Sequence, residues 1–413
     1  METNYTKKLV KLKLKNIGSE GDTTAYYNEE QINIFGGIPG ETVIAEIDIQ
    51  KKTKRKKTRI YGIVRNILIS SPYRVKPPCQ FYGFCTGCNW QHIKYDYQLK
   101  LKEQIIHNEI NSKIKSKIKI KKIINSKKQF NYRNHGRFTI RRNGLIGFTN
   151  KVTKKFAAVN HCLIMNNKIN KYIKNLENLA GESSQVSIRA SENTNSFLIQ
   201  PKFKNENIKI QTGQKDYIEQ ISGHEFQISS PSFFQVNSNQ IENMKNTILS
   251  LIKDNGKHLL VDAYSGVGTF GILLSEYFEN IIGIEQSSSA VIDAKVNIEN
   301  IPNYKILIGN SEDIIKEIKS KIDVVILDPS RKGCDEKLLN NLISHPVDNI
   351  IYISCDPKTL ARDLKILNEK KYKIQSITPI DLFPNTHHVE SITLLKIYKK
   401  LFQYKDPFNV SRA

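Results

Sequence analysis

The sequence lacks any long apolar run, and no hydrophobic stretch approaches the ~18 residues that a membrane-spanning helix needs. Its first residues, METNYTKKLVKLKLKN, also lack the apolar core of a secretory signal. A chain with neither feature is expected in the cytoplasm and away from membranes. Hydrophobic residues make up 39% of the chain and charged residues 25%, which is typical of a globular protein with its own buried core.

Acidic residues are scarce relative to basic ones. The chain has 40 Asp and Glu against 63 Lys and Arg, which gives a formal net charge of +23. An excess of positive charge attracts polyanions and favours nucleic acid as a partner. A genome rich in A and T would also raise the content of lysine, isoleucine and asparagine. Composition alone therefore leaves both explanations open.

Cysteine is also scarce, with six residues in all, yet three of them crowd into ten positions. Disulfide bonds are not expected in a cytoplasmic chain of this length. Cys79, Cys85 and Cys88 have the spacing C-x5-C-x2-C, which is typical of metal ligation, and Cys162 is available as a fourth thiolate. Four cysteines suit either a structural zinc ion or an iron–sulfur cluster. Two histidines are possible ligands, but are more readily explained as polar neighbours: His92 and His161.

No long-period repeat or low-complexity linker divides the chain, so its organisation is predicted from changes in hydrophobic pattern. Residues 1–70 alternate with period two around Gly and Pro turns, which predicts a small β-barrel suited to a nucleic-acid backbone. Residues 71–230 predict a central α+β domain that carries the cysteines. Residues 231–413 alternate helical patterns with apolar strands, as in a doubly wound α/β sheet. The basic run 51–59 is either a solvated hairpin or an RNA contact.

A glycine motif follows the first strand of the predicted α/β region, in HLLVDAYSGVGTFG. Gly266, Gly268 and Gly271 have G-x-G-x-x-G spacing, which lets a ligand approach the backbone at the start of a helix. Glu285 ends the next strand, where a carboxylate can accept hydrogen bonds from both ribose hydroxyls of an adenosine. A nicotinamide dinucleotide would be bound in a similar way, so the cofactor stays open at this point.

Polar residues also end the third and fourth predicted strands. Asn310 is placed to approach an adenine, and Asp328 is expected over the ligand crevice at the carboxyl edge of the sheet. The alternative for Asp328 is a helix N-cap. The residues that follow, Pro329 and Arg331 to Gly333, favour a specific loop instead.

Cys355 ends the fifth predicted strand, in IIYISCDP, beside the same crevice. A free cysteine is commonly a small buried apolar residue. Here its neighbours form a polar turn, and Pro357 begins a helical stretch whose N-terminus would favour a thiolate at Cys355. A thiolate, a carboxylate and an adenosine site together suit methylation of uracil. Thiolate addition to C6 makes C5 nucleophilic toward a sulfonium methyl, and a base then removes the C5 proton.

The base for that last step is expected in TPIDLFPNTHHVESITLLKIY. His387, His388 and Glu390 precede a predicted strand there, and Glu390 is the best candidate. The alternative is that Glu390 only begins an exposed edge of that strand. Further upstream, RNA contacts, inter-domain contacts or core positions are all compatible with four residues: Tyr132, Arg133, Asn134 and Phe148.

Five motifs, in this order, resemble the RNA 5-methyluridine methyltransferase family over nearly the whole chain. They are Phe234-Gln235-Val236-Asn237, Asp262 to Thr269, Asp328-Pro329-Ser330-Arg331, Ser354-Cys355-Asp356-Pro357 and His388-Val389-Glu390. Ser330 stands where the family has a second proline, which is expected to soften that loop. Thr269 stands where many members have asparagine, which puts its contact with the cofactor in doubt.

The resemblance implies a Rossmann-like S-adenosylmethionine-dependent methyltransferase domain that acts on C5 of a uridine in RNA. Cys355 would be the nucleophile, and Glu390 would be the proton acceptor. The residues implied in binding S-adenosylmethionine are Gln235, Tyr264, Glu285 and Asp328, with Asn310 and Thr269 as weaker candidates.

The resemblance also bears on the cysteines and on the substrate. A large branch of the family carries this spacing around a [4Fe–4S] cluster, which implies four ligands here: Cys79, Cys85, Cys88 and Cys162. That branch also has an RNA-binding, OB-like TRAM domain, which residues 1–70 resemble. Branches with both features include bacterial enzymes for 23S rRNA and archaeal relatives for tRNA, whereas the simpler tRNA enzymes lack both, which favours ribosomal RNA. The expected substrate is therefore a uridine of 23S rRNA, with a tRNA uridine as the alternative, and the expected state is a monomer.

Two other classes of protein share some of these features. An RNA-binding or folding factor with an inactive transferase domain should have lost Cys355 or Glu390, and both are present. An iron–sulfur oxidoreductase with a dinucleotide cofactor would account for the cysteines and the glycine motif. It would leave Cys355, Glu390 and the Phe234-Gln235 pair unexplained.

Overall fold

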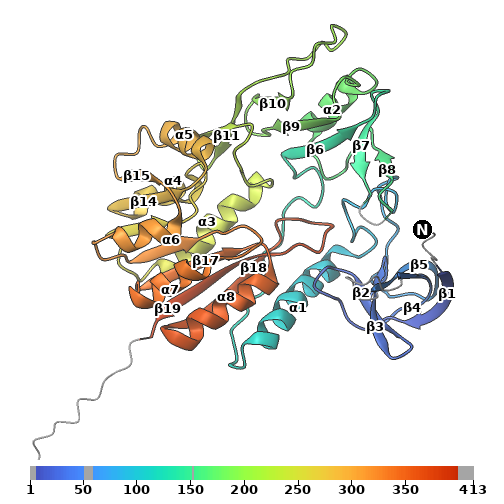
Figure 1. The fold of residues 1–413 in the computed structure, drawn as a ribbon, viewed down its shortest axis with the longest axis horizontal. Helices are drawn as coiled ribbons and strands as arrows, with labels where there is room; N and C mark the ends of the chain where they lie inside the picture. The colour runs from blue at the N-terminus through green and yellow to red at the C-terminus, as the bar shows by residue number, and fades with distance from the viewer. Residues whose placement is uncertain (1–5, 51–58, 151–152, 399–413) are drawn as a thin grey trace, which may run out of the picture.

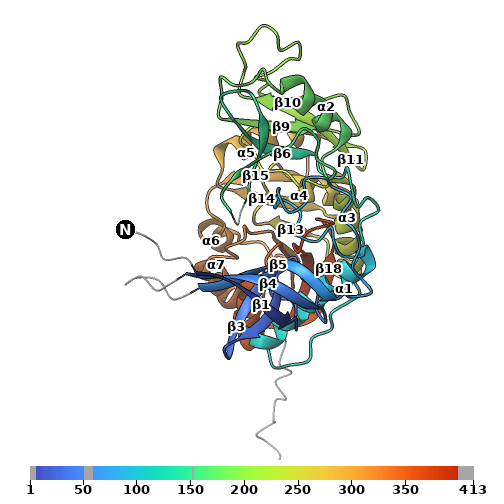
Figure 2. The same cartoon turned by 90° about the vertical axis from the view of Figure 1, so that its right-hand side faces the viewer.

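The structure is a computed structural model that describes residues 6–50, 59–150 and 153–398. Three main sheets follow one another along the chain, as the colours of Figure 1 show. The view in Figure 2 places the central sheet at one end of the molecule and the N-terminal sheet beside the large sheet. Within the described residues, none of the helices combines the length and the apolar character that crossing a bilayer requires.

The N-terminal sheet is curled, with strand order β1-β4-β5-β3-β2. Along β1, Lys11 and Lys13 are exposed while Leu12 is buried, because successive side chains of a strand point to opposite faces. The predicted identity as an OB-like, TRAM-like barrel stays a prediction, and most of the basic run 51–59 lies outside the described residues. The strands are β1 (Thr6–Lys13), β2 (Thr23–Tyr27), β3 (Glu30–Phe35), β4 (Thr42–Gln50) and β5 (Arg59–Ile69).

The central sheet has the order β10-β9-β6-β7-β8, and helix α2 covers one of its faces through a shared apolar core. A two-stranded hairpin, β11–β12, connects this sheet with the large one. The elements are β6 (His135–Ile140), β7 (Ile146–Thr149), β8 (Phe156–Ala158), α2 (Asn167–Leu176), β9 (Gln185–Ala190), β10 (Phe197–Gln200), β11 (Asp216–Ile221) and β12 (His224–Ser229).

The large sheet has seven strands in the order β15-β14-β13-β16-β17-β19-β18, and confirms the predicted α/β region. Strands β13 to β17 run parallel, and β19 runs antiparallel between β17 and β18. The strands are β13 (Leu259–Asp262), β14 (Asn280–Glu285), β15 (Tyr304–Ile308), β16 (Val324–Leu327), β17 (Asn349–Ser354), β18 (Tyr372–Ile380) and β19 (Glu390–Ile397).

Helices cover both faces of the large sheet. On one face α3 and α4 bury apolar side chains, and on the other face α1, α7 and α8 do so. Helix α1, from the segment that the sequence assigns to the central domain, thus packs within the core of the large sheet (Figure 1). The helices are α1 (Tyr95–Lys113), α3 (Ser238–Ile252), α4 (Thr269–Leu274), α5 (Ser288–Asn297), α6 (Ser311–Ile314), α7 (Glu336–Ser344) and α8 (Pro357–Lys370).

Candidate active site

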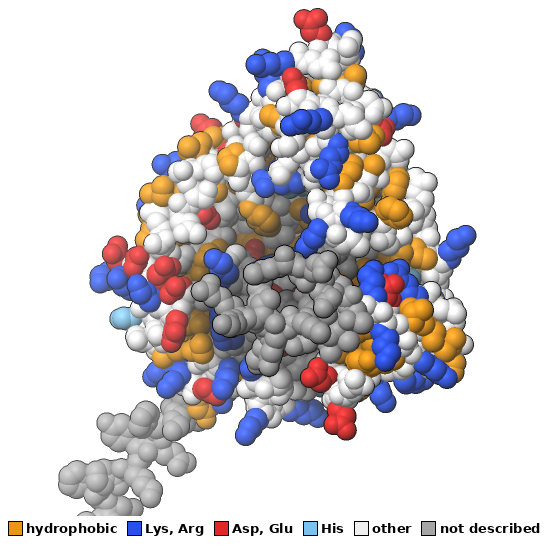
Figure 3. All heavy atoms as spheres, turned by 45° about the vertical axis from the view of Figure 1, so that its right-hand side comes forward, with side chains coloured by type: hydrophobic (Ala, Val, Ile, Leu, Met, Phe, Trp, Pro, Cys, Tyr) orange, Lys and Arg blue, Asp and Glu red, His pale blue; other side chains and the backbone are white. Residues whose placement is uncertain are grey.

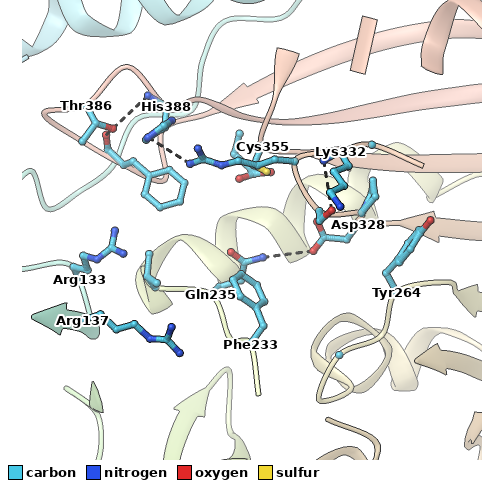
Figure 4. Close-up of a pocket in the computed structure, with 18 of the residues that line it drawn as sticks. Arg133, Arg137, Phe233, Gln235, Tyr264, Asp328, Lys332, Cys355, Thr386 and His388 are labelled. Atoms are coloured by element: carbon cyan, nitrogen blue, oxygen red, sulfur yellow. Dashed lines mark hydrogen bonds between the residues drawn. The ribbon is translucent and has the colours of Figure 1, made fainter. Parts of the chain in front are cut away.

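A cavity of about 1330 Å³ lies at the carboxyl edge of the large sheet. The carboxyl ends of β13, β14, β16 and β17 meet there, because these strands are parallel. The central sheet and the loop Cys79–Cys88 supply the opposite wall. In Figure 4, Arg133 and Arg137 face the cavity from the side opposite Cys355 and Asp328. The cavity therefore lies between the parts of the chain that the sequence assigns to two domains.

Cys355 and Glu390 come together through the register of β17 and β19. Ser354, the last residue of β17, is paired with Ser391. Because these strands are antiparallel, continuing the register by one residue places Cys355 opposite Glu390. Both residues line the cavity, and they are close enough for the charge of Glu390 to raise the pKa of Cys355. The antiparallel strand thus brings the two predicted catalytic residues to one edge from positions 35 apart in the sequence.

The Cys355 thiol is half-buried, and its pKa is raised to about 12. Burial is the largest cause, and the negative charges of Glu390 and Asp328 add to it, while Arg331 acts in the opposite direction. Burial and these carboxylates therefore favour the thiol at Cys355, and the contribution expected from the start of α8 stays a prediction. The Asp356 carboxylate caps α8 by accepting from the N–H groups of Lys358 and Thr359, which satisfies that helix end.

The Glu390 side chain is 3% exposed, so it is not an exposed strand edge. Burial raises its pKa well above the usual value, the nearby charge of Asp328 raises it further, and Arg331 lowers it. The Arg331 guanidinium is also within 3.4 Å of His388 Nε2. This arginine is therefore the cation that favours the charged forms of both Cys355 and Glu390.

Asp328 stands at the end of β16, next to Gln235, whose Nε2 donates to Asp328 Oδ2 over 3.5 Å. Burial and the charge of Asp262 raise the pKa of Asp328 to about 7. Asp262 is 1% exposed, and its own pKa is also raised to about 7, chiefly by burial. Neither of its carboxylate oxygens has a well-formed hydrogen bond, although the backbone N–H groups of Tyr264 and Gly271 lie near. Asp328 lines the cavity, and a carboxylate of this kind suits a cationic ligand, such as a sulfonium.

Glu285, at the end of β14, holds the glycine loop. Its Oε2 accepts from Gly266 N over 3.0 Å, and its Oε1 accepts from Ser287 N over 2.7 Å. Gly266 has φ +54°, and nothing lies within 4 Å of where a Cβ would be, so the backbone is open to a ligand. Asn310 caps α6 without a side-chain hydrogen bond to that helix, and it lines the same cavity. These residues fit the adenosine half of S-adenosylmethionine.

The other two predicted cofactor residues differ in position. Tyr264 lines the cavity, and its hydroxyl lies against the Cys334 thiol. Thr269 is 9% exposed in the first turn of α4 and does not line the cavity. Its contact with the cofactor stays a prediction that the geometry does not favour.

The four cysteines of the predicted cluster all line the cavity: Cys79, Cys85, Cys88 and Cys162. Burial raises the pKa of Cys88 to about 12, and the nearby Cys162, Cys85 and Cys79 raise it further, so the four thiols are neighbours. The chemistry of this donor set fits iron–sulfur or zinc. Within the described residues, however, no group of three or more ligating side chains has the arrangement of a metal site.

The two nearby histidines have different surroundings. His92 is 2% exposed, its Nδ1 is 2.5 Å from the Tyr82 hydroxyl, and burial lowers its pKa to about 4. It packs in the molecule's interior as a neutral polar neighbour of the cysteine loop. His161 is exposed and lines the cavity.

Several residues that line the cavity were not singled out as site residues from the sequence. Phe233 is 69% exposed at the cavity, whereas Phe234, its neighbour in the family motif, is buried against Phe226. Arg137 is exposed on β6 between buried neighbours, so the period-two alternation of that strand could have identified it as a residue that faces away from the core.

Of the four upstream residues that the sequence offered as RNA, inter-domain or core contacts, Arg133 and Phe148 line the cavity. Tyr132 and Asn134 are buried: Tyr132 donates to Pro384 O, and Asn134 donates to Ser238 Oγ.

Comparison with known proteins is consistent with this arrangement. The model of the family described as tRNA (Uracil-5-)-methyltransferase matches residues 100–398. An uncharacterized RNA methyltransferase of Clostridium tetani is 30% identical over 94% of this chain and 96% of its own length. Another, from Halalkalibacterium halodurans, is 27% identical over 94% of this chain and 97% of its own length.

A solved structure shares the fold over almost the whole chain. It is the tRNA (uracil-54, C5)-methyltransferase of Pyrococcus abyssi in complex with S-adenosyl-L-homocysteine. The TM-score is 0.72 at 24% sequence identity, and the match covers 94% of this chain and 100% of that chain. The α/β fold of an S-adenosylmethionine-dependent methyltransferase is therefore shared between the two.

Proposed function

The chain belongs to the tRNA (uracil-5-)-methyltransferase family and is an S-adenosylmethionine-dependent RNA methyltransferase, and we propose that it methylates a 23S rRNA uridine through a covalent Cys355 adduct. The observation that carries this proposal is the register that sets Cys355 opposite Glu390 at the edge of the cavity. Cys355 supplies a nucleophile for C6 of the base, and Glu390 supplies an acceptor for the C5 proton.

The first step is attack of the Cys355 thiolate on C6 of the uracil. The electron pair of the C5–C6 double bond then moves toward C4 and O4, which makes C5 nucleophilic. Arg331 stabilises the thiolate, because it is the cation that opposes the rise of the Cys355 pKa. S-adenosylmethionine, when bound, supplies a methyl group on a positively charged sulfur.

After C5 has gained the methyl group, it carries both that group and its original proton. The Glu390 carboxylate accepts this proton, the C5–C6 double bond forms again, and the Cys355 thiolate leaves C6. Burial of Glu390 excludes water from the acceptor and raises its affinity for the proton. Nearby positive charges must therefore favour its carboxylate form, and Arg331 is one of them.

The cofactor pocket that we propose uses residues at the ends of β14, β15 and β16, together with Gln235 from the segment between β12 and α3. Asp328 and Gln235 face the sulfonium and methionine part, and Glu285 with Asn310 faces the adenosine. The raised pKa of Asp328 supports this assignment, because a positive ligand would restore its charged form. Tyr264 completes the wall beside Asp328.

For the RNA, the opposite wall of the cavity offers positive charge and an exposed aromatic ring. We propose that Arg133 and Arg137 bind phosphates on either side of the target nucleotide, and that Phe233 stacks on a base. On the face in Figure 3, Lys and Arg side chains lie around the hollow in the upper half of the molecule. A uridine that enters the cavity must leave its stack, which a single-stranded loop permits at least cost.

We propose 23S rRNA because the chain combines an N-terminal curled sheet with the C-x5-C-x2-C loop. We assign a [4Fe–4S] cluster to the four neighbouring thiols, with a structural or RNA-facing role, since the proposed reaction transfers no electrons. The second candidate substrate is tRNA. It is favoured by the likeness, over the full length of that chain, to an enzyme that acts on tRNA.

The two substrates are distinguished by methylation of defined RNAs. Purified protein is incubated with labelled S-adenosylmethionine and either 23S rRNA fragments or tRNA transcripts, and 5-methyluridine is mapped in the products. We expect label in 23S rRNA, and loss of at least 99% of it with Cys355→Ala. Label confined to tRNA would move the proposal to the second candidate, and full transfer by Cys355→Ala would overturn the covalent mechanism.

A further inference from the structure

The turn between β1 and β2, residues Gly18–Asp22, reaches out of the N-terminal sheet to the active-site segments of the large sheet. Gly21 lies so close to His387 that a Cβ on it would be 2.2 Å from His387 Cβ and 2.5 Å from its Cγ. Gly21 also has φ +80°, in the region that favours glycine. His387 stands three residues before Glu390 in the chain.

The same turn also touches the segment that follows Cys355. Glu20 Oε1 accepts from Lys358 Nζ over 2.7 Å, and Lys358 lies in the first turn of α8. This hydrogen bond is the largest cause that lowers the pKa of Glu20, and the charges of His387 and Arg331 also lower it. The turn therefore contacts both segments that carry the proposed catalytic residues.

Neither partner of the Gly21 contact can withdraw freely. The Gly21 carbonyl accepts from Trp90 Nε1 over 2.8 Å, and Trp90 is 1% exposed. On the other side, Asn89 Oδ1 accepts from His387 N over 3.1 Å, and Asn89 Nδ2 lies 3.0 Å from His387 Nδ1. The turn and the loop before Glu390 are thus both held against Asn89 and Trp90, which directly follow the loop Cys79–Cys88.

We propose that the turn Gly18–Asp22 is a positioning element of the active site. Gly21 sets the place of His387, and Glu20 sets the place of Lys358, so that the N-terminal sheet fixes the relative position of Glu390 and Cys355. The inference rests on the proposed roles of these two residues. Through this turn the N-terminal sheet takes part in the chemical step as well as in any binding of RNA. Binding of RNA to the N-terminal sheet would then be coupled to the chemical step.

The test compares two glycines in turns that connect strands of the N-terminal sheet, in the full-length protein. Gly40 has φ +92° and nothing within 4 Å of an added Cβ, so Gly40→Ala imposes the backbone strain without a clash. Gly21→Ala imposes the same kind of strain and forces His387 to move. We expect Gly21→Ala to lower kcat at saturating RNA at least tenfold with KM for RNA within twofold of wild type. Gly40→Ala should stay within threefold of wild type in kcat.

A double-mutant cycle separates positioning from general damage. In a His387→Gly background the clashing Cβ and Cγ of His387 are gone, and Asn89 Nδ2, 2.8 Å from the added Cβ, loses its partner His387 Nδ1. The cost of Gly21→Ala relative to Gly40→Ala should therefore be much smaller there than in the wild-type background. Equal kcat for the two glycine variants in the wild-type background would overturn the inference. So would a Gly21→Ala variant whose only defect is a raised KM for RNA.

A second pair of variants decides the matter if Gly21→Ala does not fold. Glu20→Lys changes an exposed side chain and places like charges against Lys358. We expect kcat to fall at least threefold, and to recover in the charge-swapped Glu20→Lys/Lys358→Glu variant. An unchanged kcat in Glu20→Lys would overturn the inference.

The covalent adduct on 5-fluorouridine RNA is the additional readout. In Gly21→Ala the Glu390 segment is displaced but Cys355 is still present. This variant should therefore form the adduct on 5-fluorouridine RNA, although it methylates ordinary RNA slowly. If the wild-type chain forms no adduct, the proposed covalent mechanism fails. The kcat comparison between the two glycine variants needs only methyl transfer, and it still decides whether the turn positions the site.

Discussion

At the scale of single residues, the unusual feature is that both proposed catalytic groups hold their protons tightly. The pKa of Cys355 is raised to about 12 and that of Glu390 is well above its usual value. Burial is the largest cause of both shifts, the charge of Asp328 adds to both, and the charge of Glu390 adds to the shift at Cys355. We therefore expect positive charge in the cavity, such as the sulfonium of S-adenosylmethionine, to favour the thiolate of Cys355.

Replacing Glu390 with glutamine should separate the two halves of the reaction. Glutamine keeps the shape but cannot accept the C5 proton, so C6 addition and methyl transfer proceed while release does not. We expect kcat to fall by about 10²–10⁴-fold, the usual contribution of a general base. A stable complex of protein and methylated RNA should accumulate on denaturing gels. Release of free methylated RNA at the wild-type rate would contradict the role of Glu390.

The pKa of Asp328 predicts how cofactor affinity depends on pH. Its folded-state pKa is about 7, and the carboxylate form attracts the sulfonium. Binding should therefore strengthen as pH rises from 6 to 8, because more of the site is charged before the ligand arrives. Titration calorimetry with S-adenosylmethionine measures this trend, together with a small proton release near pH 7. Asp328→Asn should bind more weakly and lose the pH dependence; a trend that persists in this variant would assign it to another group.

The same shift has a consequence for stability without cofactor. For both Asp262 and Asp328 the folded-state pKa of about 7 lies above the usual 3.8. The stability that they contribute is thus fully present below about pH 4 and is lost as pH rises through 7. Cofactor binding offsets this loss, since a positive ligand favours the charged carboxylates.

At the scale of elements, α1 holds the loop that leads to Glu390. Lys102 and Asp381 are both fully buried, with Nζ 2.5 Å from Oδ1, and Lys102 Nζ also donates to Phe383 O. Tyr95 donates to Asp381 Oδ2 over 2.8 Å. These contacts join residues more than 270 positions apart in the sequence, which is why the sequence pattern alone did not place α1 against the catalytic loop.

Breaking this ion pair on one side should destabilise the protein strongly. Lys102→Met leaves Asp381 buried without its cation, which costs about 3–5 kcal/mol of unfolding free energy. The double variant Lys102→Met/Asp381→Leu should recover much of that loss, because no buried charge remains. Urea unfolding measures both, with Lys113→Met in the exposed last turn of α1 as the matched control. A single variant as stable as the control would show that the pair contributes little.

The strand pattern predicted much of the candidate site, because Glu285, Asp328 and Cys355 each end an apolar strand and so meet at one edge. The role of Arg331 could not be predicted in this way. Its loop is fixed from α8, where Asp363 accepts from Cys334 N over 2.8 Å and Arg362 donates to Lys332 O over 2.9 Å. The periodicity of a sequence does not encode such contacts between a loop and a distant helix.

At the scale of the whole molecule, the active-site cavity lies between the central and large sheets, in a chain of net charge +23. Under the proposed function, RNA that presents a uridine to Cys355 would meet Arg133 and Arg137, which face the cavity in Figure 4. The sequence predicted a basic RNA-binding protein, but not that the central sheet would form one wall of the active site. That arrangement depends on how the sheets pack, and strand periodicity does not report it.

Removal of the Arg137 charge should weaken RNA binding and leave the chemistry intact. Arg137→Ala should raise the Kd for RNA several-fold and reduce the slope of log K against log salt by about 0.7–0.9. The rate of methyl transfer from the bound complex should stay within about twofold. Arg141→Ala is the matched control, because Arg141 follows the same strand and contacts the Phe156 ring outside the cavity. An unchanged salt slope in Arg137→Ala would remove this residue from the RNA interface.

The central claim is that Cys355 bonds covalently to C6 of a uridine, and trapping that bond tests it most directly. RNA that contains 5-fluorouridine has no C5 proton to lose, so the adduct cannot resolve once the methyl group is transferred. Protein, S-adenosylmethionine and such RNA are mixed, digested and analysed by mass spectrometry. We predict a methylated 5-fluorouridine nucleotide attached to the peptide that contains Cys355, and none with Cys355→Ala. Complete absence of an adduct with RNA that the enzyme methylates when unfluorinated, or attachment at another residue, would contradict the account.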